Sequence, residues 1–296
     1  MKLNQEPGPD FVKSKLGRKL AYLHREIAPF APALLLEIDR TLRSGKKGAG
    51  NRESGYPISV DGAPQLFVRR SMRGGMMRFL GDLYLGFVPR MVYELNVISE
   101  ARKRGAPVPD PMGAIVENVA PALYRGAVLT KAIPGMTMWE FVKVETDPRS
   151  LGHVVRMARY AIDTMHEHGL IHDDLNLHNL YVSMAGDGFS VVLLDFDKAK
   201  LLSRAAPPSQ RKRNFKRLKQ SIRKLDPEGK YLDAASVKIM TGSSTLRRAV
   251  APPSPFGRGN KEGRQLLNAS RSPRSRSARR AEAPRPEPSS GRETLR

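Results

Sequence analysis

The sequence predicts an α+β fold in which a small β-rich lobe comes before a mainly helical lobe. Three features support this order. Pairs of strand-like segments occupy residues 56–70 and 114–131. A long amphipathic helix begins near Leu151. A polar loop comes directly after that helix and leads into an apolar strand that ends in Asp195. Strands therefore dominate the first part of the predicted fold and helices the second.

Turn and capping residues mark the limits of the first elements. Tyr56–Val60 and Gln65–Arg70 are expected to form a hairpin, because Asp61-Gly62 suits the positive φ angles of a tight turn. The next expected element is a helix over Arg90–Arg104, which Gly105 would end. A second strand pair is then expected over Ala114–Val119 and Arg125–Lys131.

The apolar spacing of the second half predicts two amphipathic helices. From Leu151 to Gly169 apolar residues recur every three or four positions, which predicts a helix with one face on the core. Another helix is expected over Gln210–Lys224. Its apolar face comprises Phe215, Leu218, Ile222 and Leu225. We expect this helix to dock on the core, with its basic flanks in solvent or against a membrane or substrate.

We divide the chain into an N-terminal helical extension with a Gly-rich loop, an N-lobe, a C-lobe with a basic C-terminal helix, and a basic, largely disordered tail, over residues 1–55, 56–132, 133–230 and 231–296. The extension is expected to hold a basic helix around Val12–Ile27 and a helix or strand around Ala33–Leu42. The tail is rich in Pro, Ser, Arg, Gly and Ala, which provide too little apolar surface to offset chain entropy.

Composition and charge exclude some classes of protein. The 296 residues include no Cys, which excludes disulfides and thiolate metal sites. The net charge of +22 is concentrated at 203–230, with ten Lys and Arg against two acids, and at 251–296, with eleven against four. These segments predict an anionic partner such as lipid headgroups or RNA. Few aromatic residues interleave the tail, so nucleic acid is not the expected partner. We expect neither a secretory signal nor a transmembrane helix, since apolar runs are short.

One polar loop carries the residues expected to do chemistry. It reads HDDLNLHN from His172 to Asn179, and the apolar strand after it closes on Asp195-Phe196-Asp197. The spacing His-x-Asp-Leu-x-x-x-Asn with a later Asp-Phe is typical of protein-kinase-like phosphotransferases. The alternative is that these side chains only cap turns. It is disfavoured because the helix, loop and strand occur together and in order.

Phosphoryl transfer assigns a role to each polar residue of this loop. It needs an oriented acceptor hydroxyl and a divalent metal that neutralises phosphate charge. Asp174 would orient the hydroxyl and accept its proton. Asn179 and Asp195 would supply oxygen ligands to Mg²⁺. Asn176 is placed to touch the transferring phosphate, and His172 is expected to buttress the loop by hydrogen bonding.

Residues upstream are expected to bind the nucleotide. Arg69 and Arg70 end a strand where kinases usually place the Lys that contacts the α- and β-phosphates. We favour Arg69 on motif register and Glu94 as its partner; the alternatives are a solvated strand edge and an ordinary helix acid. Lys131 is a further candidate for cofactor binding. The loop 45–51 could drape over the phosphates through Gly48 and Gly50.

Several segments share a pattern with one known family. The chain carries FVRRSMRGG at 67–75, Glu94, RGAPVP at 104–109, HDDLNLHN at 172–179 and LDFD at 194–197. Together these resemble the lipopolysaccharide kinase family, particularly its 3-deoxy-D-manno-octulosonic acid (Kdo) kinases. The basic stretch RNFKRL at 213–218 resembles the family's closing helix.

The resemblance implies a two-lobed protein-kinase-like fold that uses ATP and Mg²⁺ to phosphorylate a Kdo hydroxyl of a Kdo-containing lipid A precursor. It also implies action at the cytoplasmic face of the inner membrane, whose anionic surface the basic helix would bind peripherally. Two positions depart from the family pattern. Arg69 stands in place of Lys, and Lys198-Ala199-Lys200 stands where an Arg-Gly-Arg-like triplet is expected.

Two other functions stay open at this point. The acceptor could instead be a heptose, another small molecule or a protein. Asp173 replaces the Arg that reads a phosphorylated activation loop in protein kinases, and little chain separates Asp195 from Pro207-Pro208. Both features favour a compact or lipid-borne acceptor. A different class of function is a catalytically impaired kinase-like module that binds RNA or membranes through its basic segments.

Overall fold

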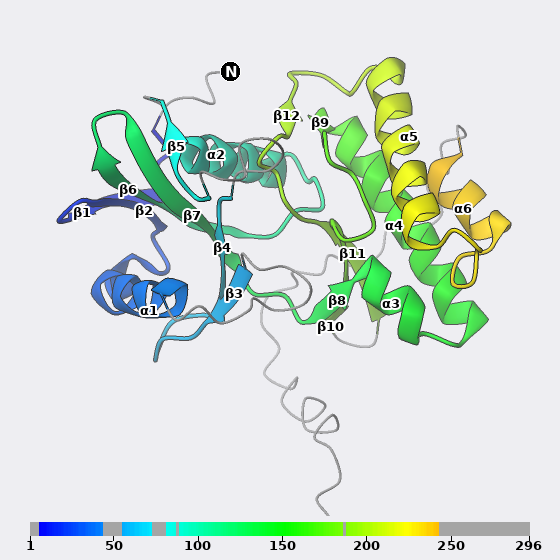
Figure 1. The fold of residues 1–296 in the computed structure, drawn as a ribbon, viewed down its shortest axis with the longest axis horizontal. Coiled ribbons are helices and arrows are strands. Elements are labelled where there is room, and N and C mark those ends of the chain that lie inside the picture. The colour runs from blue at the N-terminus through cyan, green and yellow to red at the C-terminus, as the bar shows by residue number, and fades with distance from the viewer. Residues whose placement is uncertain (1–5, 44–54, 73–80, 87–88, 186–187, 243–296) are drawn as a thin grey trace, which may run out of the picture. The chain divides into compact units, whose positions relative to one another are not determined.

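The computed structural model describes residues 6–43, 55–72, 81–86, 89–185 and 188–242. Its first half is built on a seven-stranded antiparallel sheet with the order β1-β2-β6-β7-β4-β3, in which β5 also pairs with β7 (Figure 1). The strands are β1 (Phe11–Leu16), β2 (Lys19–His24), β3 (Gly55–Ile58), β4 (Leu66–Arg70), β5 (Tyr84–Leu85), β6 (Pro111–Ala120) and β7 (Leu123–Lys131). This sheet is the expected β-rich lobe.

Helices cover both faces of the sheet. Successive residues of a strand point to opposite faces, and β6 illustrates this: Ala114 and Val116 belong to one apolar cluster, and Ile115 to the other. Helix α2 (Arg90–Lys103) packs on the first cluster. Helix α1 (Ala31–Arg43) packs on the second, after a 3₁₀ turn over Ala28–Phe30.

The expected basic helix around Val12–Ile27 is wrong, because these residues form the β1–β2 hairpin. Gly17 makes the turn with a φ of +59°. Strand β2 also pairs with β6, and its alternate residues enter the two apolar clusters, Tyr22 on one face and Leu23 on the other. Periodicity along one segment cannot reveal burial on two faces, which depends on a neighbouring strand and on helices. The segment around Ala33–Leu42, left open between helix and strand, is helix α1.

The other expected elements of this lobe are present. Strands β3 and β4 pair antiparallel, with Asp61-Gly62 inside a turn closed by a 3.0 Å hydrogen bond from the Ala63 N–H to the Val60 carbonyl. The connection is longer than a two-residue hairpin turn. Helix α2 ends at Lys103, and Gly105 follows with a φ of +87°.

The second half is mainly helical (Figure 1). Its helices are α3 (Met138–Val144), α4 (Pro148–Glu167), α5 (Pro208–Leu225) and α6 (Ala234–Thr241). Short strands join them: β8 (Gly135–Thr137), β10 (Leu180–Ala185) and β11 (Gly188–Leu193) form one sheet, and β9 (Leu170–Ile171) pairs with β12 (Lys200–Leu201). Gly169 ends α4 with a φ of +78°, as the sequence predicts. The apolar face of α5 is docked on the core through Leu218 and Ile222.

A buried arginine anchors α6 on α4 and α5. Arg159 of α4 forms an ion pair with Asp163 at 2.9 Å and donates to the carbonyls of Ile239 and Gly242 at 3.1 and 2.6 Å. Its guanidinium also lies over the ring of Phe215 in α5, 4.6 Å from the centroid. One cation thus satisfies carbonyls at the C-terminal end of α6, where a helix leaves acceptors without partners.

The boundary expected at residue 231 is wrong, because the ordered core extends further. Leu232 and Met240 are fully buried in the main apolar cluster. The first residues assigned to the tail therefore belong to the helical lobe, and the remainder, 243–296, lies outside the described residues. None of the helices in the described ranges combines the length and hydropathy that a bilayer crossing requires.

We predict that Arg159→Met lowers the free energy of unfolding by about 3–5 kcal/mol, because it leaves a buried carboxylate without its cation. Urea unfolding of the full chain measures this change. Arg156→Met, at an exposed position of the same helix, should change stability little. Arg159→Met/Asp163→Leu should be less destabilised than the single variant. Equal losses in the single and double variants would show that the ion pair is not the source of the effect.

Candidate active site

His172 fixes the start of the polar loop between β9 and β10. It is almost completely buried, its Nε2 lies 2.8 Å from the Leu194 carbonyl, and its Nδ1 accepts from the Asp174 N–H at 3.2 Å. Burial lowers the pKa of His172. The ring is therefore neutral, donating from Nε2 and accepting at Nδ1. This is the buttressing role expected from the sequence.

Two amides close the loop around the backbone carbonyl of Asp174. Asn176 and Asn179 both donate to this carbonyl from Nδ2, at 2.9 and 2.8 Å. The Oδ1 of Asn176 accepts from the N–H groups of His178 and Asn179 at 2.9 and 3.2 Å. Both polar atoms of the Asn176 amide are thus engaged by the loop's own backbone. This geometry gives Asn176 a loop-shaping role, and its expected contact with a phosphate stays a prediction.

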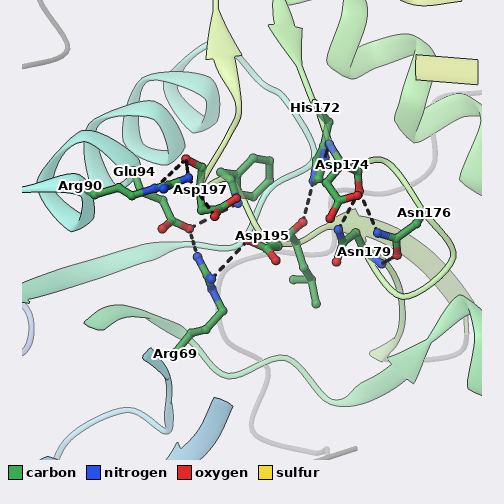
Figure 2. A network of polar contacts seen from close by, with 11 residues as sticks. Arg69, Arg90, Glu94, His172, Asp174, Asn176, Asn179, Asp195 and Asp197 are labelled. Atoms are coloured by element: carbon green, nitrogen blue, oxygen red, sulfur yellow. Dashed lines mark hydrogen bonds and ion pairs between the residues drawn. The ribbon is translucent and has the colours of Figure 1, made fainter. Parts of the chain in front are cut away.

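Strand pairing places Asp195 next to this loop (Figure 2). In the antiparallel β10–β11 pair, Leu180 lies opposite Leu193. The pairing continues one step further, because the Leu194 N–H donates to the Asn179 carbonyl at 2.9 Å. Asp195 follows with a φ of +68°, a left-handed conformation that non-glycine residues rarely adopt. The chain thereby leaves the strand beside Asn179.

The other side of Asp195 is held by a partly buried ion network (Figure 2). Arg69 of β4 pairs with Glu94 of α2, and its Nη1 lies 3.2 Å from Oδ1 of Asp195. Oε1 of Glu94 also accepts from the Phe196 N–H at 3.3 Å. The structure thus brings Arg69, Glu94 and Asp195 together. Arg70 points elsewhere, toward the Leu42 carbonyl and Asp82.

Burial and neighbouring charges shift pKa values in opposite directions in this network. Burial tends to lower the pKa of Arg69, but Glu94, Asp195 and Asp197 outweigh it and raise the pKa. Burial raises the pKa of Glu94, and Arg69 opposes that shift. The second oxygen of Glu94, Oε2, is buried and has no hydrogen-bond partner among the residues that the structure describes. Arg69 is thus the positive charge that offsets the burial of Glu94.

Arg90, which sequence reasoning missed, holds the segment after Asp195. Its Nε and Nη2 donate to the Asp197 carbonyl at 3.2 and 2.9 Å, and Nη2 also reaches Oδ2 of Asp197 at 3.0 Å (Figure 2). Burial and the neighbouring Asp195 raise the pKa of Asp197, whereas Arg90 lowers it. Arg90 and Glu94 are four residues apart on α2 and so share a face of the helix. This spacing is the signal that could have identified Arg90.

Helix α5 also supports the polar loop of residues 172–179, which we call the catalytic loop. Asn214 donates to the His172 carbonyl at 2.9 Å and accepts from the His172 N–H at 3.3 Å. Ser221 accepts from the Leu177 N–H at 3.4 Å. Arg217 pairs with the Asp174 carboxylate: its Nε lies 2.9 Å from Oδ1, and its Nη2 contacts the same oxygen. These contacts were not predicted, since the spacing of α5 revealed only an apolar face.

One expected nucleotide-binding residue, Lys131, lies away from this assembly. Lys131 ends β7, and its Nζ lies 3.8 Å from Glu26, where it lines a separate hollow with Asp10 and His24. The expectation that Lys131 binds the nucleotide is therefore not supported, because its neighbours are the charged groups of this hollow. Gly48 and Gly50 lie outside the described residues.

The oxygen donors brought together are suited to a hard divalent cation. Asp195 offers a carboxylate and Asn179 an amide oxygen, the ligand types that Mg²⁺ prefers. No cluster of three or more His, Cys, Asp and Glu side chains that could hold a metal occurs in the described part of the chain. A cation here would have to complete its coordination with phosphate oxygens and water. This is how Mg²⁺ is usually bound with nucleotides.

Comparisons with known proteins identify similar sequences and folds. Residues 48–236 match the lipopolysaccharide kinase (Kdo/WaaP) family. The chain is similar to a protein of Xylella fastidiosa (strain 9a5c) named 3-deoxy-D-manno-octulosonic acid kinase, with 32% identity over 187 residues, covering 62% of this chain and 69% of that protein. A protein of the same name from Xanthomonas oryzae pv. oryzae (strain PXO99A) is 33% identical over 192 residues, covering 62% and 69%.

One solved structure shares the fold. It is described as WaaP in complex with acyl carrier protein, and it superimposes with a TM-score of 0.50 at 15% sequence identity. The match covers 75% of this chain and 87% of that one. At this identity the likeness concerns the fold alone, which is the two-lobed kinase-like architecture expected from the sequence.

The hydrogen bond between His166 and Asn214 extends the support of the loop into α4. Nε2 of His166 lies 3.0 Å from Oδ1 of Asn214. Burial lowers the pKa of His166 from 6.5 to about 4. Arg211 and Arg159 also lower it, and the Asn214 hydrogen bond and Asp163 oppose the shift. The ring is therefore neutral in the folded protein at neutral pH.

We predict that this histidine makes stability fall as the pH falls from about 6.5 to about 4. In that window the unfolded chain binds a proton that the folded chain excludes, which costs about 1.4 kcal/mol per pH unit. Above pH 6.5 neither state is protonated, so the effect is absent. Urea unfolding at a series of pH values measures it. His166→Gln, which keeps a donor but cannot titrate, should flatten the slope by about one proton, and an unchanged slope would contradict the assignment.

Proposed function

Because the chain belongs to the lipopolysaccharide kinase (Kdo/WaaP) family, we propose that the sugar it phosphorylates is Kdo in a Kdo-containing lipid A precursor. Membership of the family makes it an ATP-dependent kinase that phosphorylates a sugar hydroxyl in lipopolysaccharide core synthesis. The names of the similar proteins from Xylella and Xanthomonas support the choice of Kdo. The observation that carries the proposal is the convergence of the catalytic loop, Asp195 and the Arg69–Glu94 pair.

In the proposed reaction Asp174 orients the acceptor hydroxyl and accepts its proton. Its main chain is fixed by Asn176 and Asn179, whereas its side chain is 35% exposed. A base must be held rigidly and yet be reachable by substrate. Asp174 combines both properties, because the amides bind its carbonyl and not its carboxylate.

Nucleotide binding is assigned to the opposite side of the site. Arg69, kept charged by its three carboxylate neighbours, would grip phosphate oxygens through its planar fork, the role that Lys has in most kinases. Asn179 and Asp195 would hold Mg²⁺. When bound, this ion would neutralise charge on the β- and γ-phosphates. Glu94 then acts as a positioning residue for Arg69.

The proposed function also requires access to a sugar that is attached to a lipid. Helix α5 has a basic surface suited to contact with the membrane that holds this lipid. The helix carries eight Lys and Arg and no acid. At 100° per residue four of these residues share an exposed flank that faces away from the catalytic loop: Lys212, Lys216, Lys219 and Arg223. We propose that this flank rests on the anionic cytoplasmic surface of the inner membrane, with each well-placed charge contributing about 1 kcal/mol at low salt.

We predict that Asp174→Asn and Asp195→Asn each lower the rate of phosphate transfer from ATP to Kdo-lipid A by about 10²–10⁴-fold. The first variant removes the proton acceptor and the second removes a charged metal ligand, and neither changes side-chain size. The measurement is product formation by mass spectrometry with Mg²⁺ present. Asp163→Asn is unsuitable as a control because Asp163 is buried. The control is Asp233→Asn, at the exposed N-cap residue of α6. Full activity of Asp174→Asn would refute the mechanism, and product on a heptose would refute Kdo as the acceptor.

We predict that replacing the four residues of the α5 flank by Gln weakens binding to phosphatidylglycerol-containing vesicles by at least on the order of tenfold. Co-sedimentation at low salt measures the bound fraction, and neutral phosphatidylcholine vesicles provide the baseline. A matched variant loses the same charge from exposed positions elsewhere: Lys15, Arg18, Arg149 and Arg156. Equal losses in the two variants would mean that net charge, and not this flank, governs binding.

A further inference from the structure

Arg217 is a cation placed on the catalytic base by an element outside the catalytic loop. Its Nε lies 2.9 Å from Oδ1 of Asp174, and its Nη2 contacts the same oxygen. The arginine side chain is 53% exposed and the aspartate 35%. Both contacts go to Oδ1, which leaves Oδ2 of the same carboxylate for an acceptor hydroxyl. An acceptor bound at Asp174 therefore lies beside the guanidinium of Arg217.

The position of α5 assigns Arg217 to the acceptor side of the base. Asp174 has the residues assigned to the nucleotide on one side and helix α5 on the other. Asn179 holds its backbone from the side where Asp195 and Arg69 lie (Figure 2), and that side is the one assigned to nucleotide. Arg217 approaches from α5, which also contacts the backbone of the loop at His172 and Leu177. A group bound by Arg217 would thus belong to the acceptor.

The present partner of Arg217 shows which kind of group the guanidinium binds. It holds a carboxylate oxygen with two of its N–H groups, and the planar guanidinium matches carboxylates better than a lysine ammonium does. A guanidinium has five N–H donors, so others remain for a second anion beside Asp174. An acceptor that brings a carboxylate with its hydroxyl supplies such an anion, and an acceptor that brings only neutral hydroxyls does not.

We propose that Arg217 is the specificity-determining residue of the acceptor site, and that its exposed guanidinium binds the carboxylate of an acidic sugar beside Asp174. This inference rests on the proposed function, because Kdo is such a sugar. Arg217 would then favour a sugar acid over a neutral sugar as acceptor. Lipid A phosphates are the other anions of the same substrate, and the test separates them from the sugar carboxylate.

The test compares acceptors and variants of the full chain in neutral-detergent micelles. The acceptors are Kdo-lipid A, its Kdo methyl ester, and Kdo-lipid A without the lipid A phosphates. The wild type should lose on the order of 10- to 100-fold in kcat/KM on the ester and little on the dephosphorylated acceptor. Arg217→Gln should lose a similar factor on the acid and show little further loss on the ester. Arg217→Lys should recover part of the activity on the acid, because it keeps the charge and loses the fork.

Several outcomes would overturn the proposal. The wild type could phosphorylate the acid and the ester equally well, or its loss could follow the lipid phosphates. Arg217→Gln could lose the same factor on acid and ester, which would assign the cation to the transferring phosphoryl group or to the loop. Arg156→Gln, an exposed α4 position, controls for loss of charge. Failure of the proposed function looks different, because the wild type would then phosphorylate none of the three Kdo acceptors.

Discussion

The partly buried guanidinium of Arg69 makes the ion pairs on which the arrangement of the site depends. It joins β4 to α2 through Glu94 and to the end of β11 through Asp195. Removing a charge from water is unfavourable unless opposite charges and hydrogen bonds compensate for it. None of the three segments can therefore hold its charged residue in place alone. The left-handed backbone at Asp195 persists because this network and the pairing of β10 with β11 both restrain it.

A second constraint acts on the catalytic loop from the helical lobe. Asn214 ties the backbone of His172 to α5 and, through His166, to α4. The loop is thus held by β11 on one side and by α5 on the other, and the carboxylate of Asp174 stays partly exposed. In the proposed function, α5 meets both the membrane surface and the acceptor. One flank faces lipid headgroups, and the flank with Arg217 faces the acceptor sugar.

Local patterns predicted much of this architecture. Gly105 and Gly169 end α2 and α4 where positive φ angles are needed, and the spacing from His172 to Asn179 identified the loop. The β1–β2 hairpin was missed because its burial comes from β6 and two helices. The hydrogen bonds of Asn176 within the loop were not predicted, because spacing along the chain does not reveal that a side chain folds back on its own loop. Lys131 was misplaced for a related reason, since a strand position does not fix which neighbour a long side chain meets.

The sequence by itself determined the chemistry available to this protein, because the type and spacing of Asp174, Asn179 and the Asp-Phe-Asp segment are local properties of the chain. It also determined the helices and turns whose signals lie within a few residues. Only the tertiary structure decided which charges meet. Arg69 and Asp195, Arg90 and Asp197, and Arg217 and Asp174 are pairs between distant segments. Coulomb attraction depends on separation in space, which the folded core sets and the order of residues does not.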